Sequence, residues 1–129
     1  MSSSHKAKTS ILVLEPDGLV AQIVVQTLER AGYLVTLAAD GITALNLVSE
    51  GEILPQVLIT DLGQEQASGL NIAEALHGLV PGLRIVVTSS KVYPSLGERS
   101  PQKPDYKFLP KPFGPRELLQ IVALSGDEA

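Results

Sequence analysis

Short apolar runs alternate along the chain with longer segments whose apolar residues recur every three or four positions. The continuous apolar run at 11–14 has the length and composition of a strand buried on both faces of a sheet, and the mainly apolar segments 57–60 and 83–88 also predict strands. The segments 33–37 and 106–109 complete a set of five predicted strands. Between them, the apolar spacing predicts amphipathic helices over about 18–31, 41–50, 70–80 and 115–122.

Residues at the ends of these segments support the predicted boundaries. Asp17 and Asp40 precede the first two helices and suit N-cap positions. Gly32 follows the first helix, where a left-handed residue commonly ends a helix. Pro81 breaks the third helix, and Pro115 suits the first turn of the last one.

Strands that alternate with helices indicate βαβ units joined by right-handed crossovers. We therefore predict an α/β fold of the flavodoxin-like type, a three-layer sandwich around a five-stranded parallel sheet in the order 2-1-3-4-5. Residues 10–126 would form this domain and residues 1–9 a flexible N-terminal arm. Between the last two strands, four helix-breaking residues (Pro94, Gly97, Pro101, Pro104) predict that an irregular Pro-rich loop replaces the fourth helix, because an interior proline costs about 3 kcal/mol.

Composition narrows the class of protein. The 129 residues suffice for one domain with a core, and the chain has no cysteine for disulfides or thiolate metal sites. The net charge of −4 argues against a nucleic-acid surface. No apolar run is long enough for a membrane span, and the start lacks a signal-peptide pattern. We expect a small cytoplasmic domain that binds neither nucleic acid nor membrane.

Four polar residues lie at or just beyond the ends of predicted strands. Glu15, Asp61, Thr88 and Lys111 follow the first, third, fourth and fifth strands, and Lys111 stands between two prolines that restrict the backbone. The carboxyl ends of parallel strands share one edge, and ligands bind in the crevice there. A lysine opposite two carboxylates at that edge suggests phosphate chemistry. Asp also caps loops, but its place after the third strand favours a site role for Asp61.

The motifs in order resemble a known family. They read ILVLEPD at 11–17, AADGITAL at 38–45, VLITD at 57–61 with Gly69 eight residues later, IVVTS at 85–89 and FLPKPF at 108–113. Together they resemble the receiver domain of bacterial two-component response regulators, which has the CheY-like version of the fold, over residues 10–125. The match leaves no segment for an output domain, so we expect a stand-alone receiver with an altered fourth-helix region.

The resemblance implies roles for particular residues. Asp61 would accept a phosphoryl group from a histidine kinase or phosphotransfer protein, with Lys111 and Thr88 contacting that group. Phe108 matches the aromatic switch position. Mg²⁺ would be held by Glu15, Asp17, Asp61 and the backbone of Gly63. The chain would catalyse only its own phosphorylation and signal through a downstream protein; its oligomeric state stays open and includes a homodimer. The Lys111–Pro112 bond is expected to be cis.

One departure from the family pattern leaves two readings open. Receivers usually carry two adjacent acidic residues after the first strand, but Pro16 occupies the second position and offers no side-chain oxygen. The first reading is an active receiver with weakly bound Mg²⁺; the second is a pseudo-receiver, an interaction module whose Mg²⁺-dependent phosphorylation is impaired. A flavodoxin-like electron carrier is disfavoured, because no Gly/Ser/Thr-rich phosphate loop follows the first strand and no aromatic pair is available to hold a flavin.

Overall fold

Five parallel strands form the central sheet of the protein. The structure, a computed structural model, describes residues 8–61, 66–89 and 106–126. The strands are β1 (Ser10–Leu14), β2 (Leu34–Ala38), β3 (Val57–Asp61), β4 (Arg84–Ser89) and β5 (Tyr106–Pro110). Their order across the sheet is β2-β1-β3-β4-β5, and every pair is parallel, so the predicted topology is confirmed.

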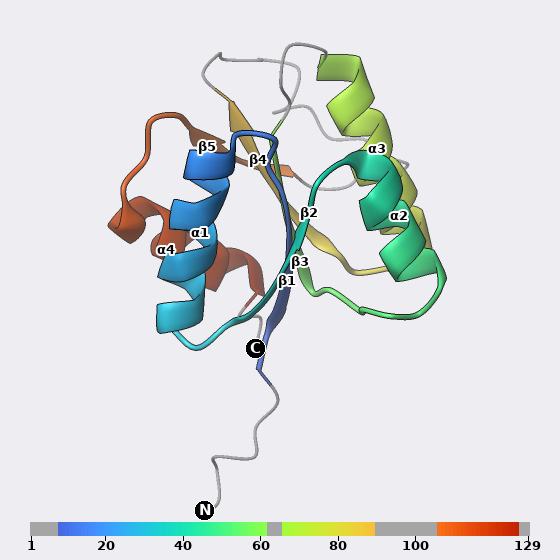
Figure 1. The fold of residues 1–129 in the computed structure, drawn as a ribbon, viewed down its shortest axis with the longest axis horizontal. Coiled ribbons are helices and arrows are strands. Elements are labelled where there is room, and N and C mark those ends of the chain that lie inside the picture. The colour runs from blue at the N-terminus through green and yellow to red at the C-terminus, as the bar shows by residue number, and fades with distance from the viewer. Residues whose placement is uncertain (1–7, 62–65, 90–105, 127–129) are drawn as a thin grey trace, which may run out of the picture.

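Helices cover both faces of this sheet, which Figure 1 shows edge-on. The described helices are α1 (Gly18–Arg30), α2 (Gly41–Ser49), α3 (Gln66–Leu79) and α4 (Pro115–Gly126). Helices α1 and α4 lie on one face, and α2 and α3 lie on the other (Figure 1). This arrangement is the predicted three-layer α/β sandwich.

Each face of the sheet has its own apolar core, since successive strand residues point to opposite sides. On β1, Leu12 packs in the cluster under α2 and α3, while Ile11 and Val13 pack in the cluster under α1 and α4. The helices contribute buried residues such as Leu76 and Leu118 to these clusters. Strands buried on both faces explain the continuous apolar runs in the sequence.

The predicted helix caps are present. Asp17 Oδ1 accepts the N–H groups of Leu19 and Val20 at 3.0 and 3.1 Å, and Asp40 Oδ1 accepts the N–H of Thr43 at 2.7 Å. Gly32 follows α1 with a positive φ of 99°, as predicted for the end of that helix. Pro115 is the first residue of α4. These local signals therefore mark the starts of α1, α2 and α4 and the end of α1.

The third helix starts earlier than predicted, and two predicted segments fall outside the described residues. The third helix was expected after Gly69 but begins at Gln66, because a helix tolerates an interior glycine at a cost of about 1 kcal/mol. The predicted irregular Pro-rich loop falls on residues 90–105, which lie outside the described residues, as do residues 1–7 of the predicted arm.

Candidate functional site at the carboxyl edge of the sheet

Three charged side chains meet at the carboxyl edge of the sheet. The ammonium group of Lys111 lies 2.8 Å from Asp61 Oδ1 and 3.1 Å from Glu15 Oε1. It also donates a hydrogen bond to Glu15 Oε2 at 3.4 Å. The Glu15 and Asp61 side chains are almost buried, with 6% and 9% of their surface exposed. One lysine therefore bridges two carboxylates that follow or end different strands.

Strand register explains why residues so distant in sequence meet. Leu14, the last residue of β1, lies opposite Thr60 on β3, so Glu15 and Asp61 leave their strands at the same level. Asp61 in turn lies opposite Thr88 on β4, and Thr88 lies opposite Leu109 on β5. Lys111 follows two residues after Leu109. The four predicted rim residues thus lie at or just beyond the ends of four adjacent strands, at one edge of the sheet.

The backbone around Lys111 is fixed from two sides. The Lys111–Pro112 peptide bond is cis, as predicted. The Lys111 N–H donates a hydrogen bond of 2.8 Å to the carbonyl of Ser89. The start of the side chain is therefore anchored to the end of β4, and the aliphatic stem extends from there toward the two carboxylates.

Opposing effects act on the pKa of Lys111. Partial burial lowers it, but hydrogen bonds and charge interactions with Asp61 and Glu15 outweigh that effect and raise the pKa above its ordinary value of 10.5. The lysine is therefore fully protonated at neutral pH. Two carboxylates and one ammonium leave the cluster with one net negative charge when all three groups are ionised.

Thr88 offers an unused hydroxyl beside this cluster. The residue is buried (1% exposed), and its Oγ1 has no hydrogen-bond partner within the described part of the chain. A buried hydroxyl without a partner costs free energy, typically 1–3 kcal/mol when it replaces a satisfied one. Such a group is available to a ligand that reaches the edge at Asp61, its neighbour across the β3–β4 ladder.

The remaining predicted site residues lie differently. Phe108 is half-buried and packs against the core under α2 and α3. Asp17 is exposed, and its side chain caps α1. Gly63 lies outside the described residues. Of the residues predicted from the resemblance, the structure therefore brings together Glu15, Asp61 and Lys111, with Thr88 on the neighbouring strand.

The described residues do not fit a divalent metal well. Among them, no group of three or more His, Cys, Asp or Glu side chains could hold a metal ion. Pro16 supplies no oxygen from its side chain, and Asp17 is committed to the helix cap. The carboxylates of Glu15 and Asp61 are both bonded to Lys111. Mg²⁺ prefers a near-octahedral set of oxygens, and this edge offers two carboxylates that already share a cation.

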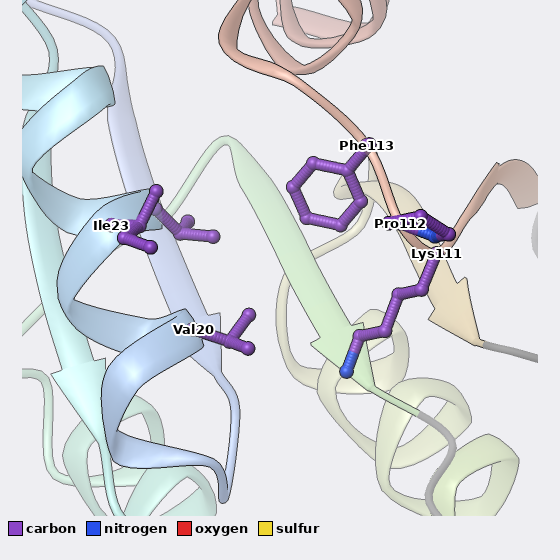
Figure 2. Close-up of a pocket in the computed structure, with 6 residues that line it drawn as sticks. Val20, Ile23, Lys111, Pro112 and Phe113 are labelled. Atoms are coloured by element: carbon purple, nitrogen blue, oxygen red, sulfur yellow. The ribbon is translucent and has the colours of Figure 1, made fainter.

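An apolar pocket of about 370 Å³ adjoins the charged cluster and was not predicted. Val20 and Ile23 on α1 form one wall, and Lys111, Pro112 and Phe113 form the other (Figure 2). Ile23 is 52% exposed, and nearby Leu19 on the same helix is 69% exposed. A signal was present in the sequence, since the α1 stripe carries more large apolar residues than one buried face requires.

No described helix is long and apolar enough to cross a membrane.

The fold and the acid–lysine cluster define a flavodoxin-like α/β domain with a charged ligand edge. The sequence model of the response regulator receiver domain matches residues 11–123. The chain belongs to the response regulator receiver domain family.

Individual relatives agree with this assignment. The chain is 30% identical over 112 residues to the response regulator receiver protein CpdR of Brucella abortus, covering 87% of this chain and 92% of that protein. It is 32% identical over 113 residues to the DNA-binding transcriptional regulator NtrC of a Bradyrhizobium strain, covering 88% of this chain. The chain spans only 23% of the length of that NtrC.

Solved structures show the same fold. The Vibrio cholerae chemotaxis protein CheY4 superimposes with a TM-score of 0.79 at 25% identity, covering 92% of this chain and 99% of that one. The protein is therefore a CheY-like receiver of the two-component type. Receiver domains are signalling domains that interact with histidine kinases and downstream targets, and they generally bind Mg²⁺ for phosphorylation.

Proposed function

We propose that this receiver accepts a phosphoryl group on Asp61 from a histidine kinase or a histidine-containing phosphotransfer protein. The observation that carries the proposal is the 2.8 Å contact between Lys111 Nζ and Asp61 Oδ1 at the almost buried edge of the sheet. An Asp61 oxygen would form the new bond to phosphorus while the phosphorus–nitrogen bond to the donor histidine breaks. The electron pair of that bond stays on the imidazole nitrogen.

The neighbouring residues support this step in distinct ways. Lys111 would neutralise negative charge on the phosphoryl oxygens, because phosphoryl transfer is catalysed mainly by positioning and charge stabilisation. The unpartnered hydroxyl of Thr88 would donate a hydrogen bond to the attached group. Phe108, which lies opposite Val87 on the neighbouring strand, would respond by repacking when the end of β4 moves.

The donor protein would dock beside the charged cluster. A phosphohistidine must come within bonding distance of Asp61, so the protein that carries it has to cover this edge. The apolar pocket between α1 and Phe113 lies at that position, and Lys111 links the two because it lines the pocket and bonds Asp61. Exposed Leu19 and Ile23 supply the apolar surface such a contact needs. The proposed donor-docking surface therefore consists of Leu19, Val20, Ile23, Pro112 and Phe113.

The proposed function also includes the bounds of the receiver domain and the cell compartment in which it acts. Residues 10–126 would form the receiver unit, supported by β1 starting at Ser10 and α4 ending at Gly126, with residues 1–9 as an arm. The protein would act in the cytoplasm and pass its signal to a downstream protein. Homodimer formation would be one way to do so, and size-exclusion chromatography with light scattering tests it.

A second function is favoured by one observation. Pro16 and the capping role of Asp17 leave two carboxylates at the edge, both bonded to Lys111. A pseudo-receiver would keep the fold and its partner surfaces but would not be phosphorylated. In that case the wild-type protein and an Asp61→Asn variant would bind the target protein with equal affinity.

The test is incubation with acetyl phosphate or phosphoramidate, followed by intact-mass spectrometry. We expect a gain of one phosphoryl group that disappears in Asp61→Asn. Asp40→Asn is the matched control, because it makes the same change at an exposed cap where Asn caps equally well. Phosphorylation of Asp61→Asn, or none of the wild type with either donor, would contradict the proposal, and the second result would favour the pseudo-receiver.

A further inference from the structure

We propose that Lys111 is the resident cation of this site, and that Glu15 is a positioning residue for Lys111 rather than a ligand for a divalent metal. The phosphoacceptor edge would then work without Mg²⁺. This inference rests on the proposed phosphorylation of Asp61 and adds how the charge of that site is balanced.

Both oxygens of Glu15 are already used. Oε1 lies 3.1 Å from Lys111 Nζ, and Oε2 accepts hydrogen bonds from Lys111 Nζ at 3.4 Å and from the Asp17 N–H at 3.1 Å. The Asp17 N–H holds the carboxylate from the loop side while the ammonium holds it from the β5 side. Glu15 is buried (7% exposed), so this position is not an incidental surface contact.

The loop between β1 and α1 withholds a further oxygen ligand. Pro16 has neither an N–H nor a side-chain oxygen. Asp17, the next residue, accepts two backbone N–H groups with Oδ1 and thereby begins α1. Turning Asp17 toward the edge would break this cap, which typically contributes about 1 kcal/mol. The loop is therefore built to stabilise a helix start, and Glu15 is its only side chain bonded to the cluster among the described residues.

The charges of the three side chains also support Lys111 as the cation of the site. The two carboxylates carry two negative charges and Lys111 returns one, so the cluster is left with a single net negative charge. A divalent cation that used Glu15 would have to bind an oxygen that Lys111 already contacts, at 3.1 or 3.4 Å, and Lys111 also holds Asp61 Oδ1 at 2.8 Å. Cation affinity at such oxygen sites depends on the number of charged ligands, and here one would-be ligand is a proline.

The experiment restores the missing oxygen. The full 129-residue chain is titrated with MgCl₂ as wild type, Pro16→Asp and Pro16→Ala, while amide NMR shifts of Asp61 and Lys111 are followed. We expect weak, non-saturating shifts for the wild type and for Pro16→Ala, and at least about tenfold tighter binding for Pro16→Asp. Pro16→Ala is the matched control, since it removes the same ring without adding a carboxylate. Pro16 is exposed, so both variants should keep the wild-type spectrum elsewhere.

Three outcomes overturn the inference. They are saturable wild-type binding as tight as that of Pro16→Asp, no gain in Pro16→Asp, and an equal gain in Pro16→Ala. The wild-type titration decides by itself should a variant not fold.

A second arm separates this inference from the proposed function. Wild-type protein is treated with phosphoramidate in EDTA and in MgCl₂. Equal phosphorylation in both supports both proposals. Phosphorylation only with Mg²⁺ overturns the inference and leaves the function intact. No phosphorylation in either solution refutes the proposed function, and with it the claim that the edge reacts without Mg²⁺. The Mg²⁺ titration then decides separately whether Glu15 positions Lys111 or binds a metal.

Discussion

Two loops at the edge of the sheet each contain a proline, and the two prolines act in opposite ways. In the β5–α4 loop, Pro112 follows the Lys111 that bonds Asp61 and Glu15, and the bond between them is cis. In the β1–α1 loop, Pro16 occupies the place where receivers usually carry an acid. One proline follows the lysine that bonds both carboxylates, and the other stands where the family resemblance predicts an acidic residue.

The difference shows that a proline at a functional site does not have one fixed structural effect. What matters is which group the proline displaces and which neighbour it constrains. The Lys111 N–H is bonded to the carbonyl of Ser89, and its ammonium group contacts two carboxylates. The side chain of Asp17, next to Pro16, instead caps the helix that it begins. The β5–α4 loop is therefore part of the charged cluster, and the β1–α1 loop contributes Glu15 alone.

The largest expected effect is the loss of the ammonium group from the β5–α4 loop. Lys111→Met should lower the rate of phosphorylation by small-molecule donors at least about 100-fold, as expected when a fixed charge or donor is removed from a charge-developing step. Rates are measured by intact-mass spectrometry over time. Lys107→Met, on β5 four residues before Lys111, serves as the control and should react at the wild-type rate. A Lys111→Met rate within about threefold of wild type would show that the cluster does not govern the reaction.

Much of the fold could be predicted, because each element carried its own signal. Apolar runs such as 57–60 marked strands buried on both faces, and caps such as Asp40 marked helix starts. Parallel pairing then required that the ends of β1, β3, β4 and β5 meet at one edge. The juxtaposition of Glu15, Asp61 and Lys111 follows from topology rather than from any local pattern.

Two features could not be predicted, since each depends on competition between groups in three dimensions. The cap role of Asp17 was predicted, but only the geometry shows that its Oδ1 is bonded to Leu19 and Val20 and that its side chain is not part of the charged cluster. The apolar pocket depends on the approach of Phe113 to α1, which the last-helix pattern did not encode. The helix predicted from residue 70 begins at Gln66 instead, because a single interior glycine weakens a helix without ending it.

The second prediction compares packing in the two loops. Phe113 is half-buried against the core under α1 and α4 and lines the pocket, so Phe113→Ala should cost about 2 kcal/mol, below the range for a fully buried phenylalanine. Pro16→Ala should change the free energy of unfolding by less than about 0.5 kcal/mol, because Pro16 is exposed. Urea denaturation of both variants measures this. Equal losses would show that the two loops pack alike.

The third prediction tests what Asp17 does. Asp17→Ala should destabilise the protein by about 1 kcal/mol through loss of the α1 cap, whereas Asp17→Asn should retain nearly full stability because Asn caps equally well. Urea unfolding supplies the free energies. Phosphorylation in MgCl₂ supplies the second readout, and Asp17→Asn should react like wild type. A large loss of reactivity in Asp17→Asn with stability intact would instead make Asp17 part of the site.

The smallest expected effect concerns the pH dependence of the Lys111 ion pairs. The raised pKa of Lys111 means that their stabilisation is complete below 10.5 and is lost as the pH rises through the higher folded-state pKa. Burial, followed by the charge of Glu74, raises the pKa of Tyr106 to about 12, so Tyr106 titrates in the same range. The comparison is therefore made in a Tyr106→Phe background, with and without Lys111→Met.

From neutral pH to about one pH unit below 10.5, the difference in unfolding free energy between those two proteins should stay constant. At higher pH the protein that retains Lys111 should lose unfolding free energy relative to the Lys111→Met variant. The loss should be about 1 kcal/mol or less, since the lysine is partly exposed and solvent screens the ion pairs. Urea unfolding across this pH range measures the difference. No loss at high pH, or a shift in favour of the protein that retains Lys111, would mean that the carboxylates of Glu15 and Asp61 do not hold the proton on Lys111. The β5–α4 loop would then not carry the cation of the site.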